Sequence, residues 1–139
     1  GELEYMLLVM LCNENRLFSK VSKEYDISEY MDKGALKIAE ILYSRLANND
    51  NCVLGELLNA LEPKEASYLV RVAETNSDLE DSDKAIQQIL NKLELLKLED
   101  LQKQTIERIK NEQDGAIRQE LGLEFSKRAE RIAELKRLA

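Results

Sequence analysis

The sequence contains no histidine and no tryptophan, and its 139 residues include only one proline, two cysteines and five glycines. Without histidine, a Ser-His-Asp or Cys-His catalytic arrangement and a histidine-based metal site are excluded. The glycines are scattered, so no glycine-rich loop is available to surround a phosphate group. Carboxylates are plentiful, but on amphipathic helices they normally form a solvated face. We therefore expect no catalytic residues, no metal site and no cofactor in this chain.

The two cysteines, Cys12 and Cys52, match no metal-binding or redox spacing. We expect both to be buried thiols in a reduced, cytoplasmic setting. The first apolar run, residues 5–12, is too short to span a membrane, and it follows glutamates instead of the Lys or Arg of a signal peptide. The chain begins with Gly1 and not with Met, so we expect it to be part of a longer protein.

The net charge of −7 is unevenly distributed along the chain. Residues 1–100 carry 11 Lys or Arg and 20 Asp or Glu, whereas residues 101–139 carry nine and seven. An acidic body disfavours nucleic-acid binding, which needs clustered cations to neutralise phosphates. The mildly basic last part suits an acidic protein surface, or it is a solvated face without a partner. We expect no direct nucleic-acid binding and no membrane association, and a salt titration would test binding by the basic last helix.

The pattern of apolar residues predicts an all-α fold. Residues 33–47 form the clearest amphipathic helix, and Pro63 suits the first turn of another helix. The polar run at residues 48–51 reads as a loop that also caps the helix after it. The acidic segment from Glu74 to Asp83 precedes a long helix, with a capping box formed by Ser77 and Glu80 and a second cap at Ser82. We therefore expect a compact helical bundle over residues 1–90.

Residues 82–139 read as nearly continuous helix with one narrow apolar stripe, which a lone helix cannot bury. The stripe stays in helical phase across Gly115, so we place a hairpin turn at residues 121–123, where Gly122 would supply a positive φ. The alternative turn is the dipeptide Asp114-Gly115. The last helix is expected to turn five apolar side chains inward: Phe125, Ala129, Ile132, Leu135 and Leu138. Its cations are expected off that seam: Lys127, Arg128, Arg131, Lys136 and Arg137.

Four segments in this order suggest a family: EYMLLVML (4–11), RLFSKV (16–21), AEILY (39–43) and AELKRL (133–138). Together with a head of short helices, a long helix and a terminal helical hairpin, they resemble the C-terminal helicase-binding domain of bacterial DNA primase. The resemblance covers essentially the whole chain. The amino-terminal collar domain of replicative helicase has a similar opening and is the alternative family.

The resemblance implies a non-catalytic interaction domain of two parts. Residues 1–90 would be a bundle that modulates the helicase. Residues 91–139 would be a long-helix extension and hairpin that dock on the amino-terminal domain of the hexameric replicative helicase. This docking would recruit primase to the replication fork for RNA primer synthesis. The zinc-binding and polymerase domains of the parent enzyme would lie upstream. The hairpin is somewhat longer than the family pattern around residues 114–125, so contacts at its tip are not transferred.

Six residues of the last helix are candidates for contact with the helicase: Phe125, Arg128, Ile132, Leu135, Lys136 and Leu138. The apolar members would be anchors, and the two cations would lie at the rim, where charge affects the association rate more than the affinity. The alternative is that the apolar members form only the seam of the hairpin itself. A self-associating helical scaffold is a further alternative, although we expect a monomer.

Overall fold

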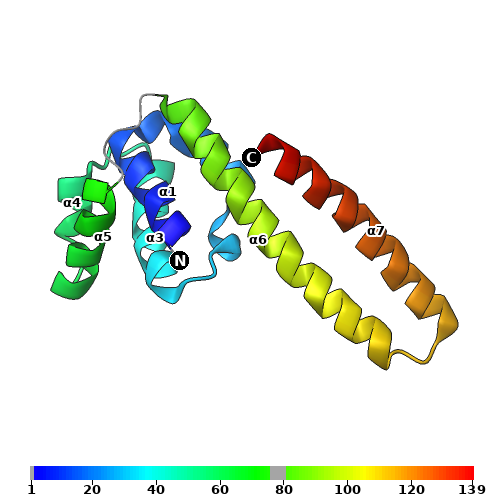
Figure 1. The fold of residues 1–139 in the computed structure, drawn as a ribbon. Helices are drawn as coiled ribbons and strands as arrows, with labels where there is room; N and C mark the ends of the chain where they lie inside the picture. The colour runs from blue at the N-terminus through cyan, green and yellow to red at the C-terminus, as the bar shows by residue number, and fades with distance from the viewer. Residues whose placement is uncertain (1, 76–80) are drawn as a thin grey trace. The chain divides into compact units, whose positions relative to one another are not determined.

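The computed structural model describes residues 2–75 and 81–139 (Figure 1), and the described residues form helices without strands. The predicted all-α class is confirmed. The chain divides into two units, residues 1–90 and residues 91–139, which are described separately. The elements are α1 (Glu2–Asn13), η1 (Asn15–Leu17), α2 (Phe18–Glu24), η2 (Ile27–Glu29), α3 (Lys33–Ala47), α4 (Leu54–Leu58), α5 (Pro63–Thr75), α6 (Ser82–Asn111) and α7 (Gly115–Leu138).

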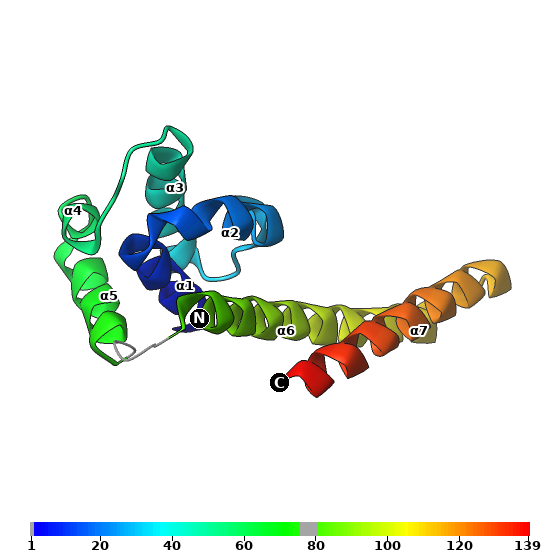
Figure 2. The ribbon, with the colours of Figure 1, turned by 90° about the horizontal axis from the view of Figure 1, so that it is seen from above.

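Helix α1 forms the core of the first unit because apolar residues surround it on nearly every side. It contacts α3, α4 and α5, and Figure 2 shows it inside the group that they form. The run from Leu7 to Cys12 is buried throughout. Burial of this kind stabilises a fold by about 1.5–3 kcal/mol for each large apolar side chain.

The predicted helix at residues 33–47 is confirmed as α3, and Pro63 is the first residue of α5, as expected. The side chain of Asp32 caps α3 by accepting a hydrogen bond from the Ala35 backbone N–H at 3.0 Å. The expected cap from the polar run at residues 48–51 is wrong, because α4 begins after Val53, which provides no side-chain cap. A helix of five residues has little macrodipole and little to gain from a cap.

The start of α6 also differs from expectation. The predicted capping box, Ser77 with Glu80, lies outside the described residues. Asp81 supplies a cap by accepting a hydrogen bond from the Lys84 backbone N–H at 3.1 Å. The hydroxyl of Ser82 instead donates to the Glu14 carboxylate at 2.6 Å, so the predicted Ser82 cap is wrong. Asp81 immediately precedes α6 and so occupies the capping position, where a charged acceptor binds a backbone N–H strongly.

A buried carboxylate organises the segment between α2 and α3. Glu4, in the first turn of α1, is only 1% exposed. Its Oε2 accepts hydrogen bonds from the Tyr25 hydroxyl at 2.6 Å and from the Met31 backbone N–H at 2.8 Å. Its Oε1 accepts one from the Asp32 backbone N–H at 2.9 Å. One side chain of α1 therefore holds both ends of the segment that contains η2.

Both cysteines are buried free thiols, as expected. Burial raises the pKa of Cys12 to about 12, with a smaller contribution from Cys52. Since the folded state favours the protonated thiol, this contribution to stability is present below about pH 9 and is lost as the pH rises toward 12.

At pH 8 we therefore expect maleimide to label Cys12 at least 100-fold more slowly in the folded protein than in guanidinium, because only the exposed thiolate reacts. Peptide-level mass spectrometry gives the rate for Cys12 alone. Equal rates in the two states would show that the thiol is accessible.

Candidate docking site: the α6–α7 hairpin

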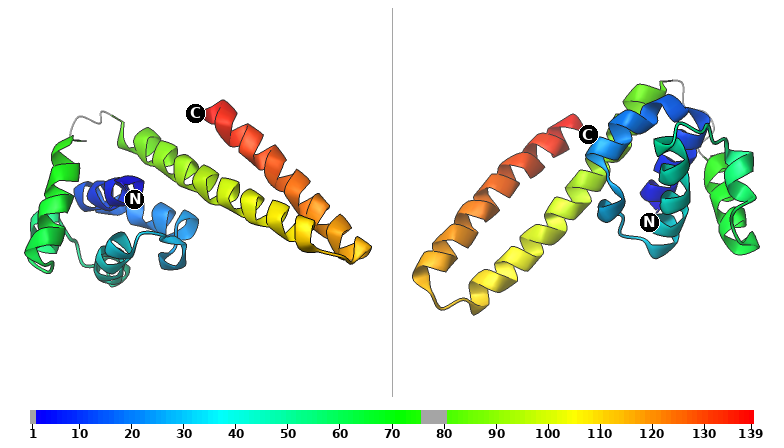
Figure 3. Two further views of the ribbon diagram at one scale, coloured as in Figure 1. Left: turned by 60° about the horizontal axis from the view of Figure 1, so that its bottom comes forward. Right: turned by 180° about the vertical axis from the view of Figure 1, so that it is seen from behind.

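The second unit is an antiparallel hairpin in which the second half of α6 runs beside α7, as all views show (Figures 1 and 3). The turn is residues 112–114, and α7 begins at Gly115. The predicted turn at residues 121–123 is therefore wrong, and the alternative at Asp114-Gly115 is correct. Gly122 lies inside α7, and no described glycine has a positive φ.

The turn forms at Asp114 because this residue caps α7. Its carboxylate accepts hydrogen bonds from the backbone N–H groups of Ala116 at 2.9 Å and Ile117 at 3.3 Å. Such a cap stabilises a helix start by about 1 kcal/mol. The continuous phase of the apolar stripe across Gly115 was misleading, because in a hairpin the stripes of both arms must face one seam whatever their phase along the chain.

The seam follows a heptad pattern on both arms, with positions separated alternately by four and three residues. On α6 these positions are Leu98, Gln102, Thr105 and Ile109, and on α7 they are Leu121, Phe125, Arg128, Ile132 and Leu135. All of them are buried or half-buried. Of the α7 positions, the sequence predicted Phe125, Ile132 and Leu135 as inward residues, whereas it did not predict Arg128 or Gln102 in the seam.

The centre of the seam is polar. Arg128 Nη1 donates to Thr105 Oγ1 at 2.6 Å and to Gln102 Oε1 at 3.3 Å. Gln102 Nε2 in turn donates to the backbone carbonyl of Phe125 at 2.9 Å. A polar contact inside an apolar seam fixes the register of two helices, because a shifted register would leave buried polar groups unpaired. The prediction that Arg128 lies off the seam is therefore wrong.

An ion pair joins the arms nearer the chain end. Arg131 donates from Nε and Nη2 to the two carboxylate oxygens of Glu94, at 2.8 and 2.7 Å. These hydrogen bonds, with Glu134 as a smaller contributor, raise the pKa of Arg131 above its ordinary value. Both side chains are about 40% exposed, so the pair adds little stability and mainly orients the arms.

The six candidate contact residues differ in accessibility. Leu135 is buried in the seam at 2% exposure, and Phe125, Arg128 and Ile132 are half-buried. Leu138, expected inward, is 59% exposed, and Lys136 is exposed. Ala129, also expected inward, is exposed. The structure therefore leaves Leu138 and Lys136 fully available to a partner and gives Leu135 a role in the hairpin.

Four other large apolar side chains of this unit are exposed and were not among the predicted contact residues: Leu96, Ile106, Ile117 and Leu123. Leu123 is the most accessible of these at 60%. An amphipathic helix that only completed a hairpin would carry polar residues at such positions. These apolar residues are visible in the sequence, but their exposure could be predicted only once the position of the hairpin turn was known.

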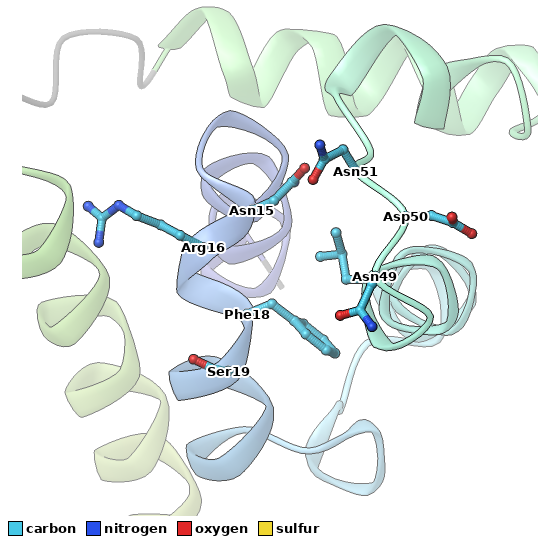
Figure 4. A pocket seen from close by; sticks show the side chains of 8 residues that line it. Asn15, Arg16, Phe18, Ser19, Asn49, Asp50 and Asn51 are labelled. Atoms are coloured by element: carbon cyan, nitrogen blue, oxygen red, sulfur yellow. The ribbon is translucent and has the colours of Figure 1, made fainter.

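The first unit has an open hollow of about 370 Å³ between α2 and the loop after α3 (Figure 4). Phe18 and Asn49 extend toward each other there, and Asn49 has a φ of 60°, which asparagine tolerates well. Asn15 is used by the fold, since its Nδ2 donates to the carbonyls of Leu11 and Cys52 at 2.7 and 2.9 Å. The hollow is thus lined partly by groups that hold the loop.

Comparisons with family models, with curated proteins and with solved structures found no match for this chain. None of the described helices is both long and apolar enough to cross a membrane. Within residues 2–75 and 81–139, no group of three or more acidic or cysteine side chains is placed to hold a metal ion.

Proposed function

We propose that this chain is a protein-docking module, and specifically the helicase-binding domain of a bacterial DNA primase. The resemblance in the sequence supplies the family. The observation that carries the docking role is a two-helix hairpin that leaves large apolar side chains exposed, among them Ile106, Leu123 and Leu138. In this proposal residues 91–139 bind the amino-terminal domain of the replicative helicase, and the bundle of residues 1–90 modulates the helicase.

Physical reasoning supports a docking role for such a hairpin. Most helix stability comes from packing of an apolar face, and two helices offer each other only one such face. In this hairpin, part of that face is occupied by polar contacts of Arg128 with Gln102 and Thr105, so less apolar surface is buried between the helices. A partner that covers the exposed apolar side chains would add the burial that the hairpin lacks.

Binding to an isolated amino-terminal domain of a bacterial replicative helicase tests the proposal. We expect the whole chain to bind in isothermal titration calorimetry. We expect a variant that ends at Leu98 to lose binding, because it lacks α7 and the facing part of α6.

Circular dichroism of the shortened variant serves as the control for a folded first unit. The proposal fails if the whole chain does not bind or if the shortened, folded variant binds equally well.

A further inference from the structure

The α6–α7 seam has two flanks, which are the two sides of the hairpin that border the line of contact between the helices. The two flanks differ in their charged contacts. One flank carries the ion pairs: Arg131 with Glu94 at 2.7 Å and Arg131 with Glu134 at 3.3 Å. Phe125, at the edge of the seam, borders the other flank, since helical spacing rotates its side chain away from that of Arg131. No ion pair among the described residues lies on that second flank.

The second flank is largely apolar. On α7 the residues in step with Phe125 are Gly122, Ala129 and Ala133, at the three- and four-residue spacing of one helix side. On α6 Ile106 follows Gln102 by one turn, and its side chain is 42% exposed. We call these five residues, Ile106, Gly122, Phe125, Ala129 and Ala133, the apolar flank.

The hairpin itself does not require glycine at position 122. A Cβ atom built there would meet no other atom within 4 Å, and the backbone has ordinary helical geometry. Glycine inside a helix is unfavourable compared with alanine. The lack of a side chain at Gly122 leaves this point of the flank open to close approach from outside, for instance by the backbone of another helix.

The charges around the apolar flank are mainly positive. Arg118 and Lys136 lie in step with it at its two ends, 18 residues apart, which is about 27 Å along the helix. Neither forms an ion pair in the part of the chain that the structure describes. On α6, Lys110 lies one turn after Ile106 on the same side of the helix. Glu99 lies two turns before Ile106 and is the carboxylate on that side. A second copy of this flank in antiparallel contact would bring Arg118 close to Lys136, so self-association is disfavoured.

We propose that the apolar flank is the docking surface for an acidic amphipathic helix of another protein, lying along α7 between Arg118 and Lys136. The partner helix would place its apolar stripe against Ile106 and Phe125, approach closely at Gly122, and set carboxylates beside the two cations. This inference rests on the proposed function and narrows it to one face of the hairpin, which includes Ile106 and excludes Leu123 and Leu138.

Two apolar variants test the face, Gly122→Leu and Ala129→Leu, with Ala116→Leu as the matched control on another side of α7. Ala129 and Ala116 are exposed, and a Cβ at position 122 would meet no other atom within 4 Å. Since leucine is a good helix former, circular dichroism should show helicity close to or above that of the parent chain. We expect the two flank variants to bind the helicase amino-terminal domain at least 10-fold more weakly, and the control to stay within twofold of the parent chain.

A charge reversal tests the chemistry of the partner. The double variant Arg118→Glu with Lys136→Glu is compared with Lys127→Glu plus Arg108→Glu, which changes the net charge equally at exposed positions away from the flank. We expect the first to weaken binding at least 10-fold at low salt and the second to have a small effect. Equal effects of the two variants would show a response to net charge alone and would overturn the assignment of an acidic helix to this flank.

A second probe separates this inference from the proposed function. A synthetic acidic amphipathic helix, with leucines on one side and glutamates beside them, should bind the parent chain and not the Gly122→Leu variant. If this peptide binds in that manner while the helicase domain does not, the proposed function fails and the flank stands. If the flank variants bind the helicase domain normally, or if Gly122→Leu dissociates a dimer in analytical ultracentrifugation, the flank inference is overturned.

Discussion

Replacing Glu4 with alanine is expected to destabilise the first unit by about 2–4 kcal/mol, because it leaves neutral hydrogen-bond donors without their acceptor at about 1–3 kcal/mol for each buried one. The change removes the acceptor for the Tyr25 hydroxyl and for the backbone N–H groups of Met31 and Asp32. The two backbone N–H groups would lose their acceptor, the Tyr25 hydroxyl would keep its hydrogen bond to the Glu29 carbonyl at 3.1 Å, and the segment containing η2 would lose its link to α1. Chemical denaturation followed by circular dichroism would give the change in the free energy of unfolding.

The variant Glu4→Gln serves as the control for shape. Glutamine keeps one oxygen acceptor and places an NH2 group where the second oxygen accepted a hydrogen bond, so it should lose roughly half as much stability as alanine. Glu2→Ala changes an exposed glutamate in the same turn and should have little effect. A loss for Glu4→Ala no larger than that for Glu2→Ala would contradict the role of the buried carboxylate.

Replacing Arg128 with alanine is the second large change. It leaves the Thr105 hydroxyl and the Gln102 Oε1 without their partner inside the seam, at a cost of about 1–3 kcal/mol. The effect should be confined to the second unit. Native-state hydrogen exchange would show faster exchange for amides in residues 101–135 and unchanged protection in α1 and α3.

Arg137→Ala provides the comparison for Arg128→Ala. Arg137 lies on the same helix, is exposed, and forms no ion pair in the described part of the chain, so its removal should leave exchange in the hairpin unchanged. If both variants open the hairpin equally, the loss of a positive charge on α7 and not the polar seam would be the cause, since alanine favours helix at least as well as arginine.

Much of the bundle could be predicted from the sequence because its signals are local. The helical spacing of apolar residues predicted α3, and the position of Pro63 predicted the start of α5. Glu4 could not be identified in this way. It reads as an ordinary acidic residue in the first turn of a helix, and its burial depends on donors more than 20 residues away in the chain.

For the hairpin, local sequence signals predicted less of the structure. The sequence indicated that two helices share a stripe, and it identified Asp114-Gly115 as a turn, but the phase argument favoured Gly122. The choice depended on how the arms pair, which is decided by contacts such as that of Arg128 with Thr105. Arg128 was assigned to the rim because a charged side chain was not expected inside a seam. Only the facing polar residues on α6 make that position favourable.

All five tyrosines belong to the first unit: Tyr5, Tyr25, Tyr30, Tyr43 and Tyr68. Since the sequence has no tryptophan, near-ultraviolet absorbance and fluorescence report on the bundle, and the hairpin is almost silent with Phe125 as its one aromatic ring. A single tryptophan in place of the exposed Leu123 would therefore give the hairpin its own optical signal. With excitation at 295 nm, where tyrosine hardly absorbs, unfolding or partner binding could be followed separately in each unit of one molecule.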